Sequence, residues 1–386
     1  MPKNIKIAYI LSFLFNALFW LGIWVLYYLL FTNYSGIGLI ETVAIASSIL
    51  AEIPTGAVAD LLGKKKTLML AFLVAGAGNL YMALANSFSI LIISVAFIAI
   101  GHSFYSGTIE ALVFDSLKEK QQEKSYQKIL AKINSIGYIS SAIASIIGGF
   151  IYTLNPRFPH LLVSFCFFIA LIICFFLKEP SIDTEKFSLK NYNFQVKQGF
   201  KQLFSQKNIK KQSLFLLTTG FFSVIAYESL IDLLAVDLGF KSQQLGFLFT
   251  AFYFSSALFS RFTPKLAQKL GNSQAFLITN LLMAIIFMTA PAMNLISGAI
   301  LILLWAGLNA ISTNIDSSVV NHHTQSKYRA TTISTLMMLK RVPYIVFAYF
   351  IGNLIDQFSV RNITFVFGIA LLLITLISYP KKTESS

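Results

Sequence analysis

The chain has 386 residues, of which 56% are hydrophobic and only 12% charged, and its mean hydropathy is +0.71. A soluble protein of this size would carry about twice that charged fraction, so the composition excludes an ordinary soluble domain. The net charge of +14 could indicate a nucleic-acid partner or anionic substrates, and the positions of the basic residues decide whether either explanation is needed.

Apolar runs of about 18 residues or more recur along the whole chain, and each can cross a hydrocarbon layer about 30 Å thick. A hydrophilic stretch, 178–212, separates six runs from six. We therefore expect an all-α membrane protein with twelve transmembrane helices, arranged as bundles 1–177 and 213–386 joined by a cytoplasmic linker. The expected spans are 7–31, 37–62, 67–84, 87–114, 129–152, 159–177, 213–236, 243–264, 274–292, 296–320, 331–355 and 360–379.

The basic residues follow the positive-inside pattern. Only Arg157, Lys241 and Arg361 fall in the odd-numbered loops, and Lys340 and Arg341 fall inside a span. The other Lys and Arg residues lie in the tails, the even-numbered loops or the adjoining helix ends, so both termini are expected in the cytoplasm. The net charge therefore reflects membrane topology, and we expect no nucleic-acid partner.

Apolar and basic side chains alternate within the linker at roughly helical spacing. This pattern favours a basic amphipathic helix lying on the inner leaflet. A plain connecting segment and a regulatory or partner-binding segment are both compatible with it. The residues of the pattern are Phe194, Phe200, Leu203 and Phe204, with Lys197 and Lys201.

The most specific motif lies between the second and third spans. The letters LAEIPTGAVADLLGKKK, 50–66, contain the spacing G-x-x-x-D-x-x-G-K-K. This spacing resembles the signature that follows the second helix of the major facilitator superfamily. The family usually has a basic residue after the Asp, and here that position is Leu61.

The resemblance implies an inner gate. Lys64 or Lys65 is expected to reach Asp115 at the end of the fourth span. Asp60 is expected beside Ala330–Thr332, because the free N–H groups and the dipole of a helix N-terminus favour an anion. These contacts would lock the outward-facing state, whereas the simpler alternative is that the residues only anchor turns at the membrane surface. The gate residues are Gly56, Asp60, Gly63, Lys64, Lys65 and Asp115.

Two further segments extend the resemblance over the whole chain. The fourth span ends in GHSFYSGTIEALVFDSLKE, 101–119, which is similar to bacterial drug and metabolite exporters of this superfamily. The eleventh span begins with KYRATTIST, 327–335, which resembles the family's RAT-x-x-S sequence. The fifth span keeps Gly148-Gly149, but Ala144-Ser145 stand where proton-driven exporters have Gly-Pro, so import remains an alternative to export.

The two halves repeat each other weakly. A shift of 208 residues places Leu62-Gly63 on Leu270-Gly271, and a shift of 206 places Glu110 on Asp316. Such repeats are typical of transporters whose substrate site lies between two related bundles near the bilayer midplane. The sequence therefore predicts two pseudo-symmetric six-helix bundles with the major facilitator fold.

Several spans contain acidic residues, although a charge at the helix centre costs about 2.5–3.5 kcal/mol by insertion scales. Desolvation disfavours the charged form of a carboxylate, so such a residue can load and release a proton as a cavity changes sides. A static ion pair to Arg261, Lys340 or Arg341 is the alternative. The proton-coupling candidates are Glu110, Asp316, Glu228, Asp232 and Glu52.

Lys340 and Arg341 lie deep in the eleventh span, about 14 Å from its start at 1.5 Å per residue. Two adjacent cations at this depth must be paired or reach water. A free cation would favour a substrate with a carboxylate or phosphate, and structural pairing with Asp232, Glu228 or Asp316 is the alternative. The substrate-binding candidates are Lys340, Arg341, Asn16, Trp20, Trp24 and Tyr227, of which the aromatic residues fit packing or interface roles equally well.

The resemblance implies a secondary transporter that works by alternating access in a bacterial inner membrane. Proton-coupled export of a drug-like or amphiphilic metabolite, as an antiporter, is our first expectation. Uptake or exchange of an anionic metabolite is the first alternative, and a scramblase or membrane sensor is the alternative from another class. The chain contains no G-x-x-x-x-G-K-[ST] motif. We expect no enzymatic activity, no cofactor and no metal, and a monomer whose partners are the substrate, protons and the lipid bilayer.

Overall fold

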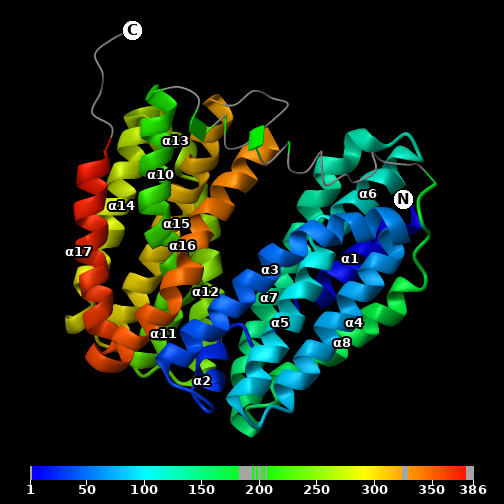
Figure 1. The fold of residues 1–386 in the computed structure, drawn as a ribbon, viewed down its shortest axis with the longest axis horizontal. Coiled ribbons are helices and arrows are strands. Elements are labelled where there is room, and N and C mark those ends of the chain that lie inside the picture. Colours follow the sequence, from blue (N-terminus) through cyan, green and yellow to red (C-terminus); the bar gives the residue numbers. More distant parts are fainter. Residues whose placement is uncertain are drawn as a thin grey trace. The chain divides into compact units, whose positions relative to one another are not determined.

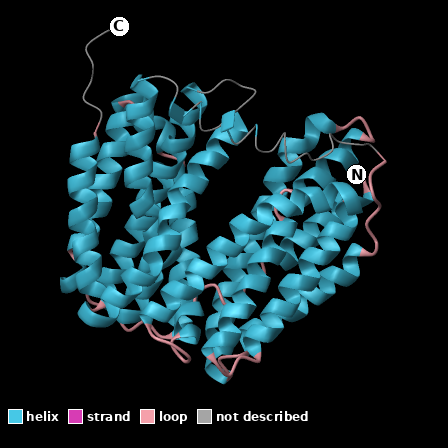
Figure 2. Cartoon of the chain, viewed as in Figure 1, coloured by secondary structure: helices cyan, strands magenta, loops and turns pink. Residues whose placement is uncertain are grey.

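The computed structural model describes residues 2–181, 207–323 and 329–379, with a few positions between 194 and 204. Within the helices, the side chains of 53–61, 207–212, 317–323, 329–331 and 333–334 are outside the described part. All described regular structure is helical, and Figure 2 shows no strand among the described residues. The expected all-α class is confirmed.

The chain divides into two compact units, which Figure 1 displays by sequence colour. The first unit comprises Met1–Leu189 with Ser242–Thr250, and the second comprises Lys190–Lys241 with Ala251–Ser386. The helices up to residue 181 are α1 (Lys3–Phe15), α2 (Trp24–Tyr28), α3 (Tyr34–Leu62), α4 (Lys64–Ala83), α5 (Phe88–Tyr105), α6 (Thr108–Lys118), α7 (Tyr126–Leu154) and α8 (Phe158–Cys174).

The later helices begin after the linker. They are α10 (Lys207–Ile225), a π turn (Ala226–Leu230), α11 (Ile231–Asp237), α12 (Ser242–Ser260), α13 (Thr263–Leu270), α14 (Asn272–Met288), α15 (Leu295–His323), α16 (Arg329–Phe358) and α17 (Val360–Ser378). Phe200 of the proposed amphipathic linker helix lies outside the described residues, whereas the other residues of the pattern are described and helical: Phe194, Lys197, Lys201, Leu203 and Phe204. Leu203 is described, and it is buried in the core of the second unit.

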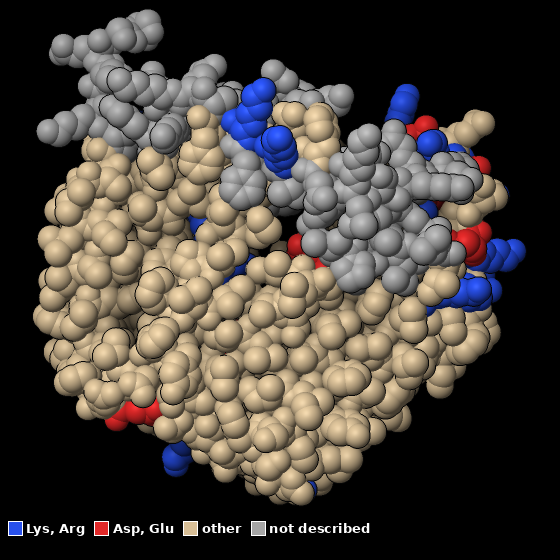
Figure 3. Space-filling model, viewed as in Figure 1, with Lys and Arg blue, Asp and Glu red and all other residues tan. Residues whose placement is uncertain are grey.

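The helices match the predicted spans in order. Eight described spans are long and apolar enough to cross a membrane, and α12 with α13, which bend by 44° at their junction, make a ninth. The shorter apolar helices α8 and α14 coincide with the expected sixth and ninth spans. The pair α1 and α2 occupies the expected first span. On the face drawn in Figure 3, uncharged residues cover most of the helix sides, as a lipid-facing surface requires.

The first span is broken, whereas the sequence predicted one helix over 7–31. Asn16 ends α1 because its amide Nδ2 donates to the Ser12 carbonyl at 2.8 Å. Asn side chains compete with helical backbone hydrogen bonds in this way. The chain then passes through turns before α2 begins. Gly148 of α7 packs against this break, and a Cβ there would collide with the Phe19 carbonyl oxygen.

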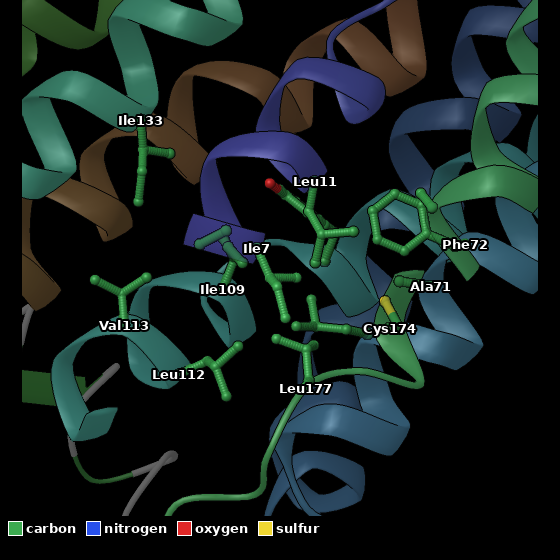
Figure 4. Packing of buried hydrophobic residues seen from close by; sticks show 14 of the residues in the cluster. Ile7, Leu11, Ala71, Phe72, Ile109, Leu112, Val113, Ile133, Cys174 and Leu177 are labelled. Atoms are coloured by element: carbon green, nitrogen blue, oxygen red, sulfur yellow. The ribbon is translucent and has the colours of Figure 1, made fainter. Parts of the chain in front are cut away.

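Apolar residues of the first unit form a core around α1, shown in Figure 4. Ile7 and Leu11 lie one turn apart on α1, as the i, i+4 spacing predicts, and both are buried. Phe72 of α4 and Leu112 of α6 are buried in the same cluster. Cys174 at the end of α8 also belongs to it, so this cysteine has a packing role.

The predicted repeat is confirmed at one backbone feature. Gly63 precedes α4 with φ 85° and ψ 158°, and Gly271 precedes α14 with φ 77° and ψ 155°. Both values lie in a region that only glycine adopts readily. The aligned glycines therefore perform the same task, a sharp turn between two membrane helices.

Candidate functional site

A buried ion pair lies at the N-terminal end of α4. The Lys64 ammonium pairs with the carboxylate of Asp115, which is fully buried near the end of α6. This is the contact that the resemblance implied for Lys64 or Lys65. Lys65 instead donates from Nζ to the Phe175 carbonyl at 2.7 Å. The motif thus joins α4 to both α6 and the end of α8.

Glu179 completes this end of the first unit, and the sequence analysis did not identify it. Its two carboxylate oxygens accept from the backbone N–H groups of Lys64 and Lys65, at 2.7 and 2.8 Å. An anion is favoured there because the first N–H groups of a helix lack partners and carry its positive dipole end. A Cβ at Gly63 would lie 2.8 Å from the Glu179 carboxyl carbon, so glycine also provides space for this cap.

Asn4 and Glu119 add further bonds to the same segment. The Asn4 amide donates to Ser116 Oγ and to the Lys178 carbonyl, both at 2.8 Å, and accepts from the Lys178 N–H at 3.0 Å. Ser181 donates its backbone N–H and its hydroxyl to Glu119. Residues 178–181 are therefore held on the first unit immediately before the linker.

The side chains of two predicted gate residues lie outside the described part of the chain. Gly56 and Asp60 lie on α3, but their side chains are outside the described residues. Ala330 and Thr331 are likewise outside the described side chains. The contact predicted between Asp60 and the start of the eleventh span therefore stays a prediction.

Glu110 follows a second helix break, at Ser106-Gly107, where Gly107 has φ 77°. It lies in the first turn of α6, and one of its carboxylate oxygens is buried without a hydrogen bond to any described residue. The ring of Tyr105, just before the break, stacks on Phe15 with centroids 3.6 Å apart. Among the described residues, no lysine or arginine forms an ion pair with Glu110.

The other candidates of the first span take packing positions. Asn16 uses its amide to cap α1, as described above. Trp24 is buried and meets Tyr28 edge to face. Trp20 stacks on His160, and its indole N–H is buried without a bond to a described residue. Glu52, on the second span, is exposed on α3.

The second unit carries an ion pair inside its spans. The Lys340 ammonium on α16 pairs with Asp316 on α15, and the two residues are only 3% and 4% exposed. Gly220 of α10 makes room for this lysine, since a Cβ there would collide with Lys340 Cε. Lys340 is therefore paired with Asp316, one of the partners named in the alternative to its substrate-binding role.

Arg341, the next residue, has a different environment. Its NH2 group donates to Glu228 Oε1 at 2.9 Å, and its side chain is 52% exposed, against 23% for Glu228. Glu228 lies in the π turn Ala226–Leu230. Such turns are frequent at functional sites because they shift the side chains that follow out of the regular helical phase.

Tyrosines and one more acid surround this second pair. Tyr227 is 43% exposed, and its hydroxyl is hydrogen-bonded to that of Tyr253 on α12. The carboxylates of Glu228 and Asp232 lie near enough to the Tyr253 hydroxyl to interact with it electrostatically. Asp237, further along the same span, pairs with Arg361 at 2.8 Å and marks the helix end.

The described residues contain no group of three or more His, Cys, Asp or Glu side chains that could hold a metal ion. The second unit contains two ion pairs within its spans. The pair of Lys340 with Asp316 is buried, and the pair of Arg341 with Glu228 is partly exposed. Membrane-embedded charges of this kind serve ion or substrate pathways.

Comparison with known proteins agrees with this arrangement. The family model of the Major Facilitator Superfamily matches residues 7–342. An MFS-type transporter of Bacillus subtilis strain 168, YxaM, described as uncharacterized, is 26% identical over 268 residues. That match covers 67% of this chain, and the chain spans 65% of the length of the relative.

Solved structures show the same fold at lower identity. The nucleoside transporter NupG has a TM-score of 0.83 at 14% identity, covering 97% of this chain and 98% of its own. A POT family transporter bound to 5-aminolevulinic acid has a TM-score of 0.72 at 14% identity, covering 98% and 95%.

The fold and the paired charges inside its spans define a multi-pass membrane protein of a transporter class. The chain belongs to the Major Facilitator Superfamily, since the family model covers most of its length. The relatives described above are all transporters, and the predicted fold of two six-helix bundles is that of this superfamily.

Proposed function

We propose that this secondary transporter moves a drug-like or amphiphilic metabolite out of the cell in exchange for protons, by alternating access. The buried pair of Asp316 and Lys340 carries the proposal. A buried ion pair stabilises little compared with well-packed apolar residues, so its presence inside the spans supports a role beyond folding.

The pair supplies a switch that a proton can operate. While Asp316 is ionised, it holds Lys340 between α15 and α16. Protonation of Asp316 removes the only negative charge that neutralises this ammonium among the described residues, and an unpaired charge cannot remain buried at low cost. Lys340 must then reach water or another anion, which requires α16 to repack against its neighbours. Proton binding is thereby converted into helix movement.

The Lys64–Asp115 pair is proposed as the lock that opposes this movement. It joins α4 to α6, and Glu179 fixes the same end of α4. Gly63 permits the turn, and Lys65 secures α8. Gly56 and Asp60 are proposed to complete the gate from α3. In this proposal the gate and both termini face the cytoplasm of a bacterial cell, and the protein works as a monomer in the inner membrane.

Uptake or exchange of an anionic metabolite is the second candidate. The half-exposed guanidinium of Arg341 favours it, because a cation open to solution inside a span attracts anionic groups. The export direction in the first candidate rests on the resemblance of the fourth span to bacterial exporters, and flux measurements distinguish the two directions.

Flux into proteoliposomes tests the proposal. Purified protein would be reconstituted and given pH gradients of either sign, with ethidium as an amphiphilic cation and taurocholate as an amphiphilic anion. We expect flux that reverses with the gradient and is lost in Asp316→Asn, while Asp237→Asn, a matched acid paired at a helix end, keeps it. Gradient-independent movement of labelled lipid would instead indicate a scramblase, and binding without flux would indicate a sensor.

A further inference from the structure

The two adjacent cations of α16 differ in what they can contact. Lys340 is 3% exposed and enclosed by Asp316 and Gly220, whereas the Arg341 side chain is 52% exposed. Arg341 is the thirteenth residue of α16, about 18 Å from its first residue at 1.5 Å per residue. A guanidinium at that depth would be costly against lipid, so its open side must face water.

Arg341 also has unused hydrogen-bonding capacity. A guanidinium has five N–H donors in a planar fork, and Arg341 gives one hydrogen bond, to Glu228, within the described residues. A carboxylate or phosphate can take two parallel bonds from such a fork. The single bond to Glu228 is therefore weaker than the one a free anion could form at the same group.

Among the described residues, Glu228 forms an ion pair with Arg341 and with no other cation. Arg341 comes from α16, the Tyr253 hydroxyl from α12 interacts with Glu228 electrostatically, and Asp232 follows it by four residues on the same span. Among these only Arg341 is positive, and Asp232 is a like charge. If Arg341 turned to another anion, Glu228 would remain as an uncompensated carboxylate inside the membrane, which is costly unless the group is neutralised.

We propose that Arg341 and Glu228 form an exchange site for an organic anion of carboxylate or phosphate type. The anion replaces Glu228 on the Arg341 guanidinium, and the released Glu228 carboxylate takes up one proton from the solution. This inference rests on the second candidate of the proposed function, uptake of an anionic metabolite, and adds the substrate class and the place where substrate and proton meet.

The exchange balances in charge for a singly charged anion. Before binding, Arg341 and Glu228 sum to zero. After binding, the cation of Arg341, the anion and the neutral Glu228 also sum to zero, because one proton enters with one anion. Tyr227, half-exposed beside Glu228 and close to Phe252 with ring centroids 6.2 Å apart, gives an aromatic surface for the apolar part of the ligand.

Binding in detergent tests the site without any gradient. Benzoate, phenyl phosphate and the uncharged benzamide would be titrated calorimetrically near neutral pH, in two buffers of different ionisation enthalpy. We expect benzoate to bind with uptake of about one proton, as the linkage between anion and Glu228 requires. Phenyl phosphate, whose second pKa is about 6, should bind with uptake of up to one proton more, and benzamide should bind much more weakly. Comparing the two anions identifies which head group the site takes.

Variants then assign the roles. Arg341→Gln should weaken anion binding by about tenfold or more, as expected for a charge-assisted bond, and Arg341→Lys should recover part of it. Glu228→Gln should still bind benzoate but without proton uptake. Arg361→Gln, which removes an ion-paired arginine from the same unit, should change neither quantity, and gel filtration confirms that each variant is folded.

Two results would overturn the inference. One is equal binding of benzoate, phenyl phosphate and benzamide, or no binding of either anion at the highest soluble concentrations. The other is proton uptake with benzoate that persists unchanged in Glu228→Gln. Failure of gradient-driven flux with intact anion binding would instead contradict the proposed function alone.

Discussion

The two units share a glycine turn between neighbouring helices, but their ion pairs lie at different positions. Gly63 and Gly271 turn the chain before α4 and α14 with nearly the same dihedral angles. In the first unit this turn is followed by Lys64 and its pair with Asp115 at the end of the spans. In the second unit Asn272 follows the turn, and two ion pairs lie within the spans instead.

This difference shows which property a repeat preserves. The shared geometry is a turn that both halves need in order to connect neighbouring helices. Charged residues can differ between equivalent positions of the two halves, because each position packs against different neighbouring residues. The first unit therefore provides a charged helix end suited to a lock, and the second provides charges at membrane depth suited to coupling and recognition.

The largest effect is expected where the second unit buries its charges. Lys340→Met leaves Asp316 unpaired in the interior and should destabilise the protein by about 3–5 kcal/mol, the usual cost of breaking a buried pair. The double variant Lys340→Met with Asp316→Leu should recover most of that loss. Thermal unfolding in detergent and the folded yield by gel filtration measure both.

Gly220→Ala provides an independent check on the same pair. Its Cβ would collide with Lys340 Cε and should lower stability, whereas Gly76→Ala, whose nearest contact would lie at 3.4 Å, should be tolerated. If Lys340→Met and the double variant are equally stable, the buried charge of Asp316 is not the source of the effect.

A second comparison uses the two equivalent glycines. Alanine at either position is forced into a backbone region that costs about 1–3 kcal/mol. Gly271→Ala meets no atom within 4 Å, whereas at Gly63 the new Cβ also meets the Glu179 carboxylate at 2.8 Å. We therefore expect Gly63→Ala to lower the thermal midpoint more than Gly271→Ala. Equal losses would mean that Glu179 moves aside freely.

A smaller effect is expected for the cap itself. Glu179→Gln keeps one of the two acceptor oxygens that bind the N–H groups of Lys64 and Lys65, replaces the other by an NH2 group, and removes the charge at the helix N-terminus. The charge is worth about 0.3–1 kcal/mol in such positions and is screened by salt. The loss in thermal stability should therefore shrink as ionic strength rises, and a salt-independent loss would exclude a dipole effect.

The smallest effect concerns Glu119 at the end of α6. Hydrogen bonds from Ser181, first from its hydroxyl and then from its backbone N–H, hold the pKa of Glu119 below its usual value. A carboxyl whose pKa falls on folding stabilises the protein above its ordinary pKa and loses that contribution as the pH drops through the folded value.

Ser181→Ala should therefore cost slightly in stability at neutral pH, with no change across the neutral range. The difference from the wild type should shrink as the pH falls below about 4, the ordinary carboxyl pKa, and vanish once the pH lies below the lowered pKa of Glu119 in the folded protein. Thermal midpoints across pH measure this, and a difference that grows in acid would reverse the expected sign.

The spans were predictable because their apolar runs match membrane thickness, and the Lys64–Asp115 contact because the motif resembles a known signature. The helix break after Asn16 was not predictable from hydropathy, because it depends on a single hydrogen bond from the Asn16 amide to the Ser12 carbonyl. The different environments of Lys340 and Arg341 were not predictable from sequence either, because they depend on tertiary packing. Neighbouring residues on a helix point about 100° apart, and only the packing of α10 and α15 decides which one is enclosed.

The bonds of residues 178–181 have a consequence for how the protein is made. Asn4, near the start of the chain, holds Lys178, and Glu179 completes the end of α4, so the first and last parts of this bundle are joined to each other. A ribosome must therefore have released the residues just after α8 before the first bundle can close. Once it has, that bundle holds its own ends together while the second is still being synthesised.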